Sequence, residues 1–224
     1  MVTGLGTLTS LGNDPETFFN NLLDGKCGID TVTRFDPDLS TIKIASEVKD
    51  FDVTQYWDPK DAKRYDRYTH LAMGAAREAL NDGGLDMANV DAKRFGVLIG
   101  SGVGGLEAVE TSCRTLFEKG PKRITPFLLP SIIGNTAGAQ VAIALGCKGP
   151  NFGIVSACAT GTHALGESLK MLQLGDADVM LAGGTEAAVT PLGFAGFSSM
   201  RAMCADCNES PQTASRPFDA DRSG

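Results

Sequence analysis

A continuous apolar run at residues 95–99 (FGVLI) constrains the fold of this chain more than any other feature. A short run of this kind, without alternation, is typical of a strand that is buried on both faces. Residues 177–182 are predicted to form a second strand of the same type. Segments with helical spacing alternate with these strands, and the alternation predicts an α/β fold with a mainly parallel sheet covered by helices.

Four further segments are predicted as helices from the spacing of their apolar residues and from their end signals. Asp14 is the expected N-cap of the first helix, directly before Pro15. Gly146 is expected to end the last helix, whose alanines indicate close packing against a neighbour. The four predicted helices cover residues 15–23, 68–80, 105–117 and 131–145.

Cys158 stands where a predicted strand meets a predicted helix. Residues 153–157 are interpreted as a short buried strand, and helical spacing then continues until Gly175 ends it. A cysteine near a helix N-terminus lies beside unpaired N–H groups that stabilise a thiolate, which is the nucleophilic form. The pattern therefore makes Cys158 a candidate nucleophile. The alternative is a small buried apolar residue, which is what most free cysteines are.

Composition argues against several functional classes. The net charge of the 224 residues is −7, which disfavours nucleic acid as the main partner. No apolar run approaches the roughly 20 residues needed to span a bilayer, so no membrane partner is expected. The six cysteines are irregularly spaced and do not resemble a disulfide framework, which favours a reducing compartment.

No metal site is predicted. Cys204 and Cys207 form a C-x-x-C pair, but they lack a second ligand pair and stand in a polar stretch that is interpreted as a surface loop. The only histidines, His70 and His163, are isolated.

The glycines at 100, 102 and 105 match G-x-G-x-x-G between a predicted strand and a predicted helix, as in dinucleotide-binding turns. The segment that follows contains Lys119-Gly120-Pro121 and two more prolines, which makes a poor central strand, and no acidic residue ends it. Dinucleotide binding is therefore the weaker interpretation of this loop.

Six segments, in order along the chain, resemble those of the β-ketoacyl-[acyl-carrier-protein] synthases, the condensing enzymes of fatty-acid synthesis. The most specific of them, residues 155–161 (VSACATG), is similar to the active-site segment of that family and contains Cys158. The other five segments are residues 2–6, 100–105, 124–127, 176–186 and 214–219.

The resemblance implies a thiolase-like fold, whose two βαβαβαββ halves form five layers, α-β-α-β-α. Residues 1–224 would be the N-terminal domain of such an enzyme, truncated, with the C-terminal half absent. Both ends look cut, since residues 2–3 would already belong to the opening strand.

In the family, the cysteine accepts an acyl group from the phosphopantetheine arm of acyl carrier protein, and no other cofactor takes part. Cys158 would be both the nucleophile and, through its backbone N–H, an oxyanion donor. Condensation with malonyl-carrier then needs two histidines that the resemblance assigns to the second half. Neither His70 nor His163 fits their motifs, so we expect this chain alone not to condense. His70 is interpreted as a surface or helix-packing residue, and His163, at a position where family members vary, as structural.

The resemblance also implies roles for other side chains. The expected partners are acyl carrier protein and a second copy of the chain in a homodimer, whose contact would include the strand before Cys158. The expected acyl-pocket residues are Val103, Leu128 and Phe197. The expected carrier-binding residues are Lys60, Lys63, Arg64, Lys122, Arg123 and Arg201.

Two alternatives stay open. One is a ketosynthase domain of a polyketide synthase, and the other is a non-catalytic partner subunit with the same fold, against which Cys158 argues. The expected location is the cytoplasm, or the plastid stroma if a transit peptide precedes the sequence.

Overall fold

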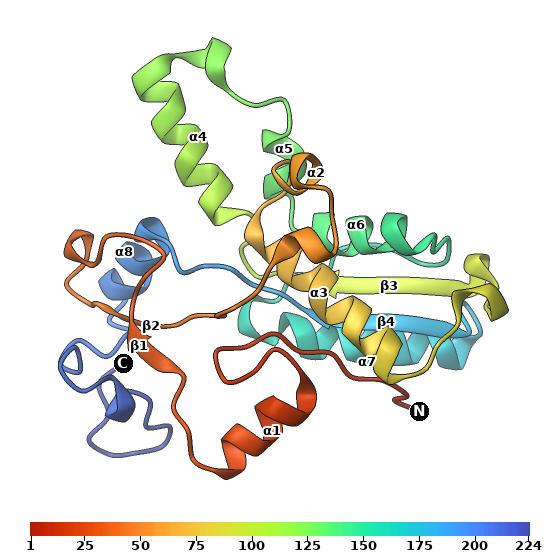
Figure 1. Ribbon diagram of the computed structural model, residues 1–224, viewed down its shortest axis with the longest axis horizontal. Coiled ribbons are helices and arrows are strands. Elements are labelled where there is room, and N and C mark those ends of the chain that lie inside the picture. Colours follow the sequence, from red (N-terminus) through yellow and green to blue (C-terminus); the bar gives the residue numbers. More distant parts are fainter. The chain divides into compact units, whose positions relative to one another are not determined.

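The computed structural model describes all 224 residues, and their contacts divide the chain into two compact units. The larger unit comprises Met1–Gly6 and Asp52–Ala187, and the smaller one comprises Thr7–Phe51 and Ala188–Gly224. Figure 1 shows the course of the chain through its helices and strands. By length and hydropathy, none of the helices is able to cross a membrane.

The larger unit is built on two parallel strands, β3 (Phe95–Gly100) and β4 (Val179–Gly184). β3 is buried along its whole length, as its unbroken apolar run predicts. The prediction that the second strand is fully buried is wrong, because β4 is only partly buried and its last residue is exposed. The reason is its position, since β3 is also covered on its other edge, through the bridge between Val97 and Asn151, whereas β4 has a neighbour on one edge only.

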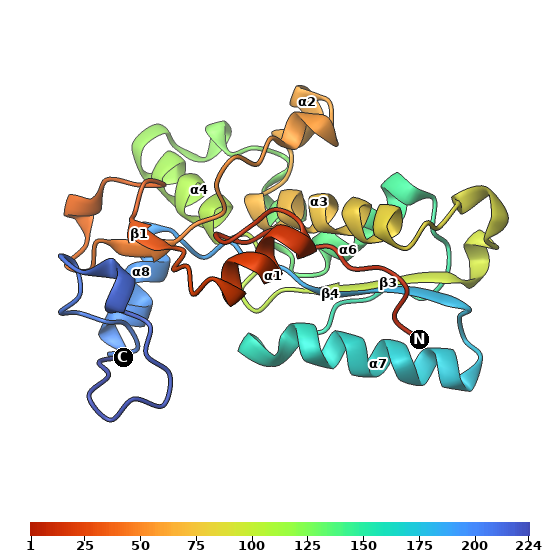
Figure 2. The same cartoon turned by 60° about the horizontal axis from the view of Figure 1, so that its bottom comes forward.

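Helices cover both faces of this sheet (Figure 2). α3 (Arg67–Asp82) and α6 (Thr136–Leu145) pack on one face, and α7 (Thr160–Leu174) packs on the other. α7 buries Thr160, Ala164 and Ser168, which follow one another at the four-residue spacing of one helix face. The predicted helices at residues 68–80 and after Cys158 are thus confirmed, including the stop at Gly175, which has a left-handed backbone.

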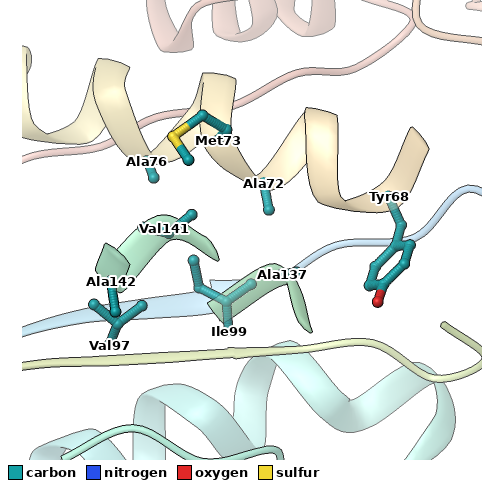
Figure 3. Close-up of a cluster of buried hydrophobic side chains, with 9 residues drawn as sticks. All are labelled: Tyr68, Ala72, Met73, Ala76, Val97, Ile99, Ala137, Val141 and Ala142. Atoms are coloured by element: carbon teal, nitrogen blue, oxygen red, sulfur yellow. The ribbon is translucent and has the colours of Figure 1, made fainter. Parts of the chain in front are cut away.

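The core of the larger unit lies between α3, α6 and β3 (Figure 3). Val97 and Ile99 of β3 face alanines of α6, and the small alanine side chains let the helix approach the strand. Full burial of each large apolar side chain is worth about 1.5–3 kcal/mol. The buried members of the cluster are Tyr68, Ala72, Met73, Ala76, Val97, Ile99, Ala137, Val141 and Ala142.

The helix predicted over residues 131–145 is in fact two helices, α5 (Leu128–Ile132) and α6. The chain leaves the helical conformation at Ile133, so the carbonyl of Ile133 is free to accept other hydrogen bonds. The buried Tyr68 hydroxyl donates to it at 2.6 Å, and Thr136 N donates to it at 3.0 Å. A contact from 65 residues away thus stabilises the break.

Two other helices and a buried carboxylate complete this unit. α2 (Pro59–Ala62) is short, and α4 (Leu106–Lys119) confirms the helix predicted over residues 105–117 but buries no side chain. Asp66 caps α3 and also accepts a hydrogen bond from Ala108 N of α4 at 2.8 Å. Burial raises the pKa of the Asp66 carboxyl above its usual value, despite these backbone hydrogen bonds.

Two predicted strands are absent. Residues 1–6 form no strand and instead pack on α3, where a Cβ on Gly6 would come within 1.9 Å of the Ala75 carbonyl oxygen. Residues 153–157 also form no strand. Pairing with β3 stops at the bridge between Asn151 and Val97, and Val155 beyond it is exposed. The segment before Cys158 is therefore an extended approach to the turn rather than a buried strand.

The smaller unit contains α1 (Pro15–Leu23), α8 (Pro191–Ser199) and the antiparallel strands β1 (Ile29–Thr31) and β2 (Ile44–Ser46). Both predicted ends of α1 are confirmed, and Asp14 accepts a hydrogen bond from Thr17 N at 2.7 Å as its N-cap. The core of this unit consists of Val32, Ile42, Ile44, Phe194 and Cys207.

Candidate functional site

Cys158 lies in a sharp turn directly before α7. It is the middle residue of a single 3₁₀ turn, Ala157–Ala159, and its side chain is exposed. The residue before it, Ala157, has a φ of +51°, which is unfavourable for any residue other than glycine. The backbone N–H of Cys158 has no hydrogen-bond partner within the chain. The turn thus presents both a thiol and an unpaired donor at one point.

Two side chains near the start of α7, those of Thr160 and His163, bind Ser156, which directly precedes the Cys158 turn. Ser156 N donates to the Thr160 hydroxyl at 2.9 Å, and the Ser156 hydroxyl hydrogen-bonds to Nδ1 of His163 at 2.6 Å. Thr160 is buried, whereas His163 is exposed. Ser156 immediately precedes Ala157, so these hydrogen bonds stabilise the unfavourable left-handed backbone conformation of Ala157. The interpretation of His163 as structural agrees with this contact.

The glycine loop after β3 lies beside the turn. A Cβ added to Gly102 would lie 3.3 Å from the carbonyl oxygen of Ala157, so the two backbone segments approach each other closely. Glu186, just after β4, accepts hydrogen bonds from Gly102 N at 2.9 Å and Val103 N at 3.1 Å. The Ser101 hydroxyl donates to the same carboxylate at 3.0 Å. These are the donors that a phosphate would use in a dinucleotide site, and here an internal carboxylate has taken them.

The three predicted acyl-pocket residues lie in three different elements. Val103 is 51% exposed in the glycine loop, and Leu128 is half-buried at the start of α5. Phe197 is 42% exposed on α8 in the smaller unit. The glycine loop that carries Val103 lies close to the Cys158 turn, and the acyl pocket formed by all three residues stays a prediction.

The predicted carrier-binding residues are all exposed, but they differ in their own contacts. Arg64 is engaged within the chain, since its guanidinium pairs with Asp61 at 2.9 Å and lies 5.0 Å from the centre of the Phe127 ring. Lys63 and Lys122 make no such contact, and neither do Lys60, Arg123 and Arg201. Lys60 lies in α2, and Lys63 and Arg64 follow that helix. Lys122 and Arg123 lie in the Pro121–Arg123 3₁₀ turn, and Arg201 follows α8.

His70 is a packing residue of α3. Its Nε2 hydrogen-bonds to the carbonyl of Ala62 at 2.9 Å, and its ring contacts Trp57 edge-on at 5.6 Å between centroids. Burial lowers the pKa of His70 below its usual value, and the nearby Arg67 acts in the same direction. A half-buried imidazole that packs against a neighbouring ring fits the helix-packing interpretation of His70.

The C-x-x-C pair differs from its prediction as a surface loop. Cys204 and Cys207 are joined by a disulfide, and Cys207 is only 5% exposed because it belongs to the core of the smaller unit. The two sulfurs and the Asp206 carboxylate lie within 4.8 Å of one another, but sulfurs that are joined in a disulfide are not the thiolates that bind a metal. Cys204 also lines a cavity of about 430 Å³ in this unit, formed with Ile42 and Arg216 among others.

Sequence reasoning missed Ser156, Thr160 and Glu186 as parts of the site. Glu186 carried a usable signal, because a polar residue at the carboxyl end of a strand next to a glycine loop commonly faces a site. Thr160 and Ser156 carried none, since hydroxyl residues are common at the start of any helix.

Similar solved structures define the class of protein. A beta-ketoacyl synthase from Burkholderia phymatum matches 100% of this chain and 55% of its own, with a TM-score of 0.85 and 26% identity. The ishigamide ketosynthase/chain length factor matches 100% of this chain and 54% of its own, with a TM-score of 0.87 and 28% identity. The chain has the thiolase-like α/β fold of the ketoacyl synthases, which confirms the predicted fold class.

The family follows from the sequence comparisons. The family described as "Beta-ketoacyl synthase, N-terminal domain" matches residues 1–224, and the chain belongs to that family. The 3-oxoacyl-[acyl-carrier-protein] synthase 2 of Synechocystis sp. is 47% identical over all 224 residues. Those residues cover 54% of that relative, so the chain spans about half the length of the curated relatives it matches.

Proposed function

We propose that the full-length protein is a condensing enzyme of fatty-acid synthesis that elongates acyl chains held on acyl carrier protein. The observation that carries this proposal is the Cys158 turn, which offers an exposed thiol beside an unpaired backbone N–H in front of a helix. The name and identity of the Synechocystis relative support the same function.

In the first step, the thiolate of Cys158 attacks the carbonyl carbon of an acyl-carrier thioester. The carbonyl oxygen gains negative charge, and the Cys158 N–H donates to it. When the tetrahedral intermediate collapses, the bond to the phosphopantetheine sulfur breaks, and the arm leaves as a thiolate that takes up from solvent the equivalent of the proton that Cys158 lost. The product is an acyl-enzyme thioester, and no cofactor is needed beyond the arm that carries the substrate.

In the second step, malonyl-carrier loses carbon dioxide, and the resulting carbanion attacks the acyl group on Cys158. The 3-oxoacyl chain leaves on the carrier, and the thiolate of Cys158 is restored. Donors must stabilise the enolate formed on decarboxylation, and neither histidine of this chain supplies one, since His70 is bound to the Ala62 carbonyl and His163 to Ser156. Residues 1–224 alone are therefore expected to form the acyl-enzyme at most.

The test uses the full-length protein and acyl carrier protein loaded with an acyl group. Intact mass should increase by one acyl group, and the Cys158→Ala variant should show no increase. Cys113→Ala is the matched control, because Cys113 is also exposed but lies on α4. Acylation that survives in the Cys158→Ala variant would refute the proposal.

The acidic carrier is proposed to dock on basic residues that have no partner within the chain. Lys63, Lys122 and Arg123 meet this condition, whereas Arg64 is engaged by Asp61 and Phe127. Reversal of the three free charges should raise the KM for acyl-carrier and leave the rate of Cys158 alkylation by iodoacetamide unchanged. Lys93→Glu is the control, because this exposed lysine lies just before the first residue of β3, whereas the glycine loop follows its last residue. An equal change in the control would refute the docking surface.

A homodimer is proposed for the full-length protein. Phe152 and Val155, in the segment before Cys158, are 44% and 64% exposed although apolar, as expected of a surface that a second copy covers. A monomeric mass at micromolar concentration would contradict this. The proposed location is the cytoplasm or the plastid stroma.

A polyketide ketosynthase is the second candidate, since the ishigamide ketosynthase/chain length factor is among the structural neighbours. Its 28% identity, against 47% for the fatty-acid synthase relative, favours the first candidate. Turnover with ordinary saturated acyl-carrier substrates would separate the two.

A further inference from the structure

Glu186 closes the glycine loop from the neighbouring strand. Its Oε2 accepts hydrogen bonds from two successive backbone N–H groups, those of Gly102 at 2.9 Å and Val103 at 3.1 Å. Its Oε1 accepts from the Ser101 hydroxyl at 3.0 Å. Successive N–H groups that converge on one point form a nest, a backbone shape that binds anions. The anion in this nest is the side chain of the protein itself.

The middle of the loop depends on Glu186 alone. The start of the loop is fixed by the buried Ser101, whose hydroxyl accepts from Gly104 N at 2.9 Å, and its end is fixed by Gly105 N, which donates to Ile132 O at 3.5 Å. Gly102 N and Val103 N have no acceptor other than the Glu186 carboxylate. Without it, these two residues are free to move while the ends of the loop stay in place.

Movement of this segment would be felt at the nucleophile. Gly102 lies close to Ala157, the residue before Cys158, because a Cβ added to this glycine would come within 3.3 Å of the Ala157 carbonyl oxygen. The next residue, Val103, is half-exposed and is the first large side chain of the loop. Glu186 therefore controls the position of an apolar side chain beside the turn that carries the thiol.

We propose that Glu186 is a positioning residue that holds Val103 and so sets which chain lengths reach Cys158. In the part that concerns acyl chains, this inference rests on the proposed function. Its physical content, that the carboxylate holds the loop against the nucleophile turn, is independent of any acyl donor.

The test compares two alkylating agents on full-length protein, iodoacetamide and N-decyl iodoacetamide, by the rate at which each modifies Cys158. In Glu186→Ala, the ratio of the two rate constants should change by about threefold or more, while the iodoacetamide rate stays within about twofold of the wild type. Glu186→Gln should keep the wild-type ratio, because its amide oxygen still accepts from both N–H groups. Glu118→Ala is the control, since it removes an exposed carboxylate of α4.

Three results would overturn the inference. These are an unchanged ratio in Glu186→Ala, an equal loss of both rates, which would indicate only a folding role, and a Gln variant as altered as the Ala variant. A further arm adds acetate to Glu186→Ala. Acetate should refill the nest and restore the ratio, and failure of acetate would count against the nest.

Acyl transfer from acyl carrier protein is measured on the same wild-type sample. If wild-type Cys158 takes no acyl group, the proposed function fails, and the alkylation ratio still decides the role of Glu186. If wild-type Cys158 is acylated and the ratio does not respond to Glu186→Ala, only the positioning role fails.

Discussion

The hydroxyl of Thr160 is predicted to keep the nucleophile turn in its unfavourable conformation. Thr160→Val removes that hydroxyl while it keeps the shape of the side chain, which is 4% exposed. Ser156 N then loses the acceptor that it now has at 2.9 Å. An unsatisfied donor that is largely removed from water costs about 1–3 kcal/mol, and this is the expected loss in free energy of unfolding.

The same change should lower the reactivity of Cys158. The left-handed backbone of Ala157, with its φ of +51°, costs about 1–2 kcal/mol for a residue with a Cβ. The lost hydrogen bond is of similar size, so the turn is expected to relax in a large fraction of molecules. A shift of 1–2 kcal/mol changes a population by about 5- to 30-fold, and the alkylation rate of Cys158 should decrease by a factor of the same size.

Thr160→Ser provides the matched control. It keeps the hydroxyl and loses only the methyl group that packs near Gly100, at an expected cost of about 0.8 kcal/mol. Urea unfolding gives the stability of each variant, and the iodoacetamide rate at fixed pH gives the reactivity. The reasoning is refuted if Val and Ser variants alkylate at the same rate, or if the Val variant alkylates as fast as the wild type.

Three further predictions concern the scaffold. Val97→Ala should reduce the free energy of unfolding by about 2–3 kcal/mol, because Val97 is fully buried in the core; the 78%-exposed Leu174→Ala should stay within about 0.5 kcal/mol in the same urea titration. Tyr68→Phe should cost about 1–2 kcal/mol, since the Ile133 carbonyl loses one of its two donors, and a loss as small as that of Leu174→Ala would mean that water replaces the hydroxyl. Burial lowers the pKa of the His70 imidazole in the folded chain. Its contribution to the free energy of unfolding is therefore fully present above the usual pKa near 6.5. That contribution is lost as the pH falls further, because the unfolded chain then binds a proton that the folded chain does not bind. His70→Gln should flatten the stability-against-pH curve below pH 6.5, and an unchanged slope would exclude His70 as its cause.

Local signals predicted the parts of the fold that local forces determine. α1 begins and ends where Asp14, Pro15 and the polar end of the segment indicate, because capping acts within a few residues. β3 is predicted equally well, since an unbroken apolar run has no polar face and therefore indicates a strand that is buried on both faces. The thiol at the strand-to-helix junction was also found, although what precedes it is not a strand.

The remaining features depend on partners far away in the sequence. The break between α5 and α6 is stabilised by Tyr68, and the glycine loop is closed by a carboxylate 83–85 residues later. Cys207 was placed on the surface because its neighbours in the sequence are polar, whereas its neighbours in space are apolar. No pattern within a short window contains these contacts, so the bracing of the site required the structure.

The close approach of Gly102 to Ala157 has a consequence for how the sequence can vary over evolutionary time. A Cβ on Gly102 would come within 3.3 Å of the Ala157 carbonyl oxygen and within 3.0 Å of Glu186 Oε2. At Ala157, a β-branched residue would face a left-handed backbone that it rarely adopts. A side chain at position 102 would therefore crowd the turn, and a β-branched residue at position 157 would strain it. Among descendants of this sequence, positions 102 and 157 should stay small together, and a lineage that enlarges one of them should also have reshaped the strand-to-helix turn.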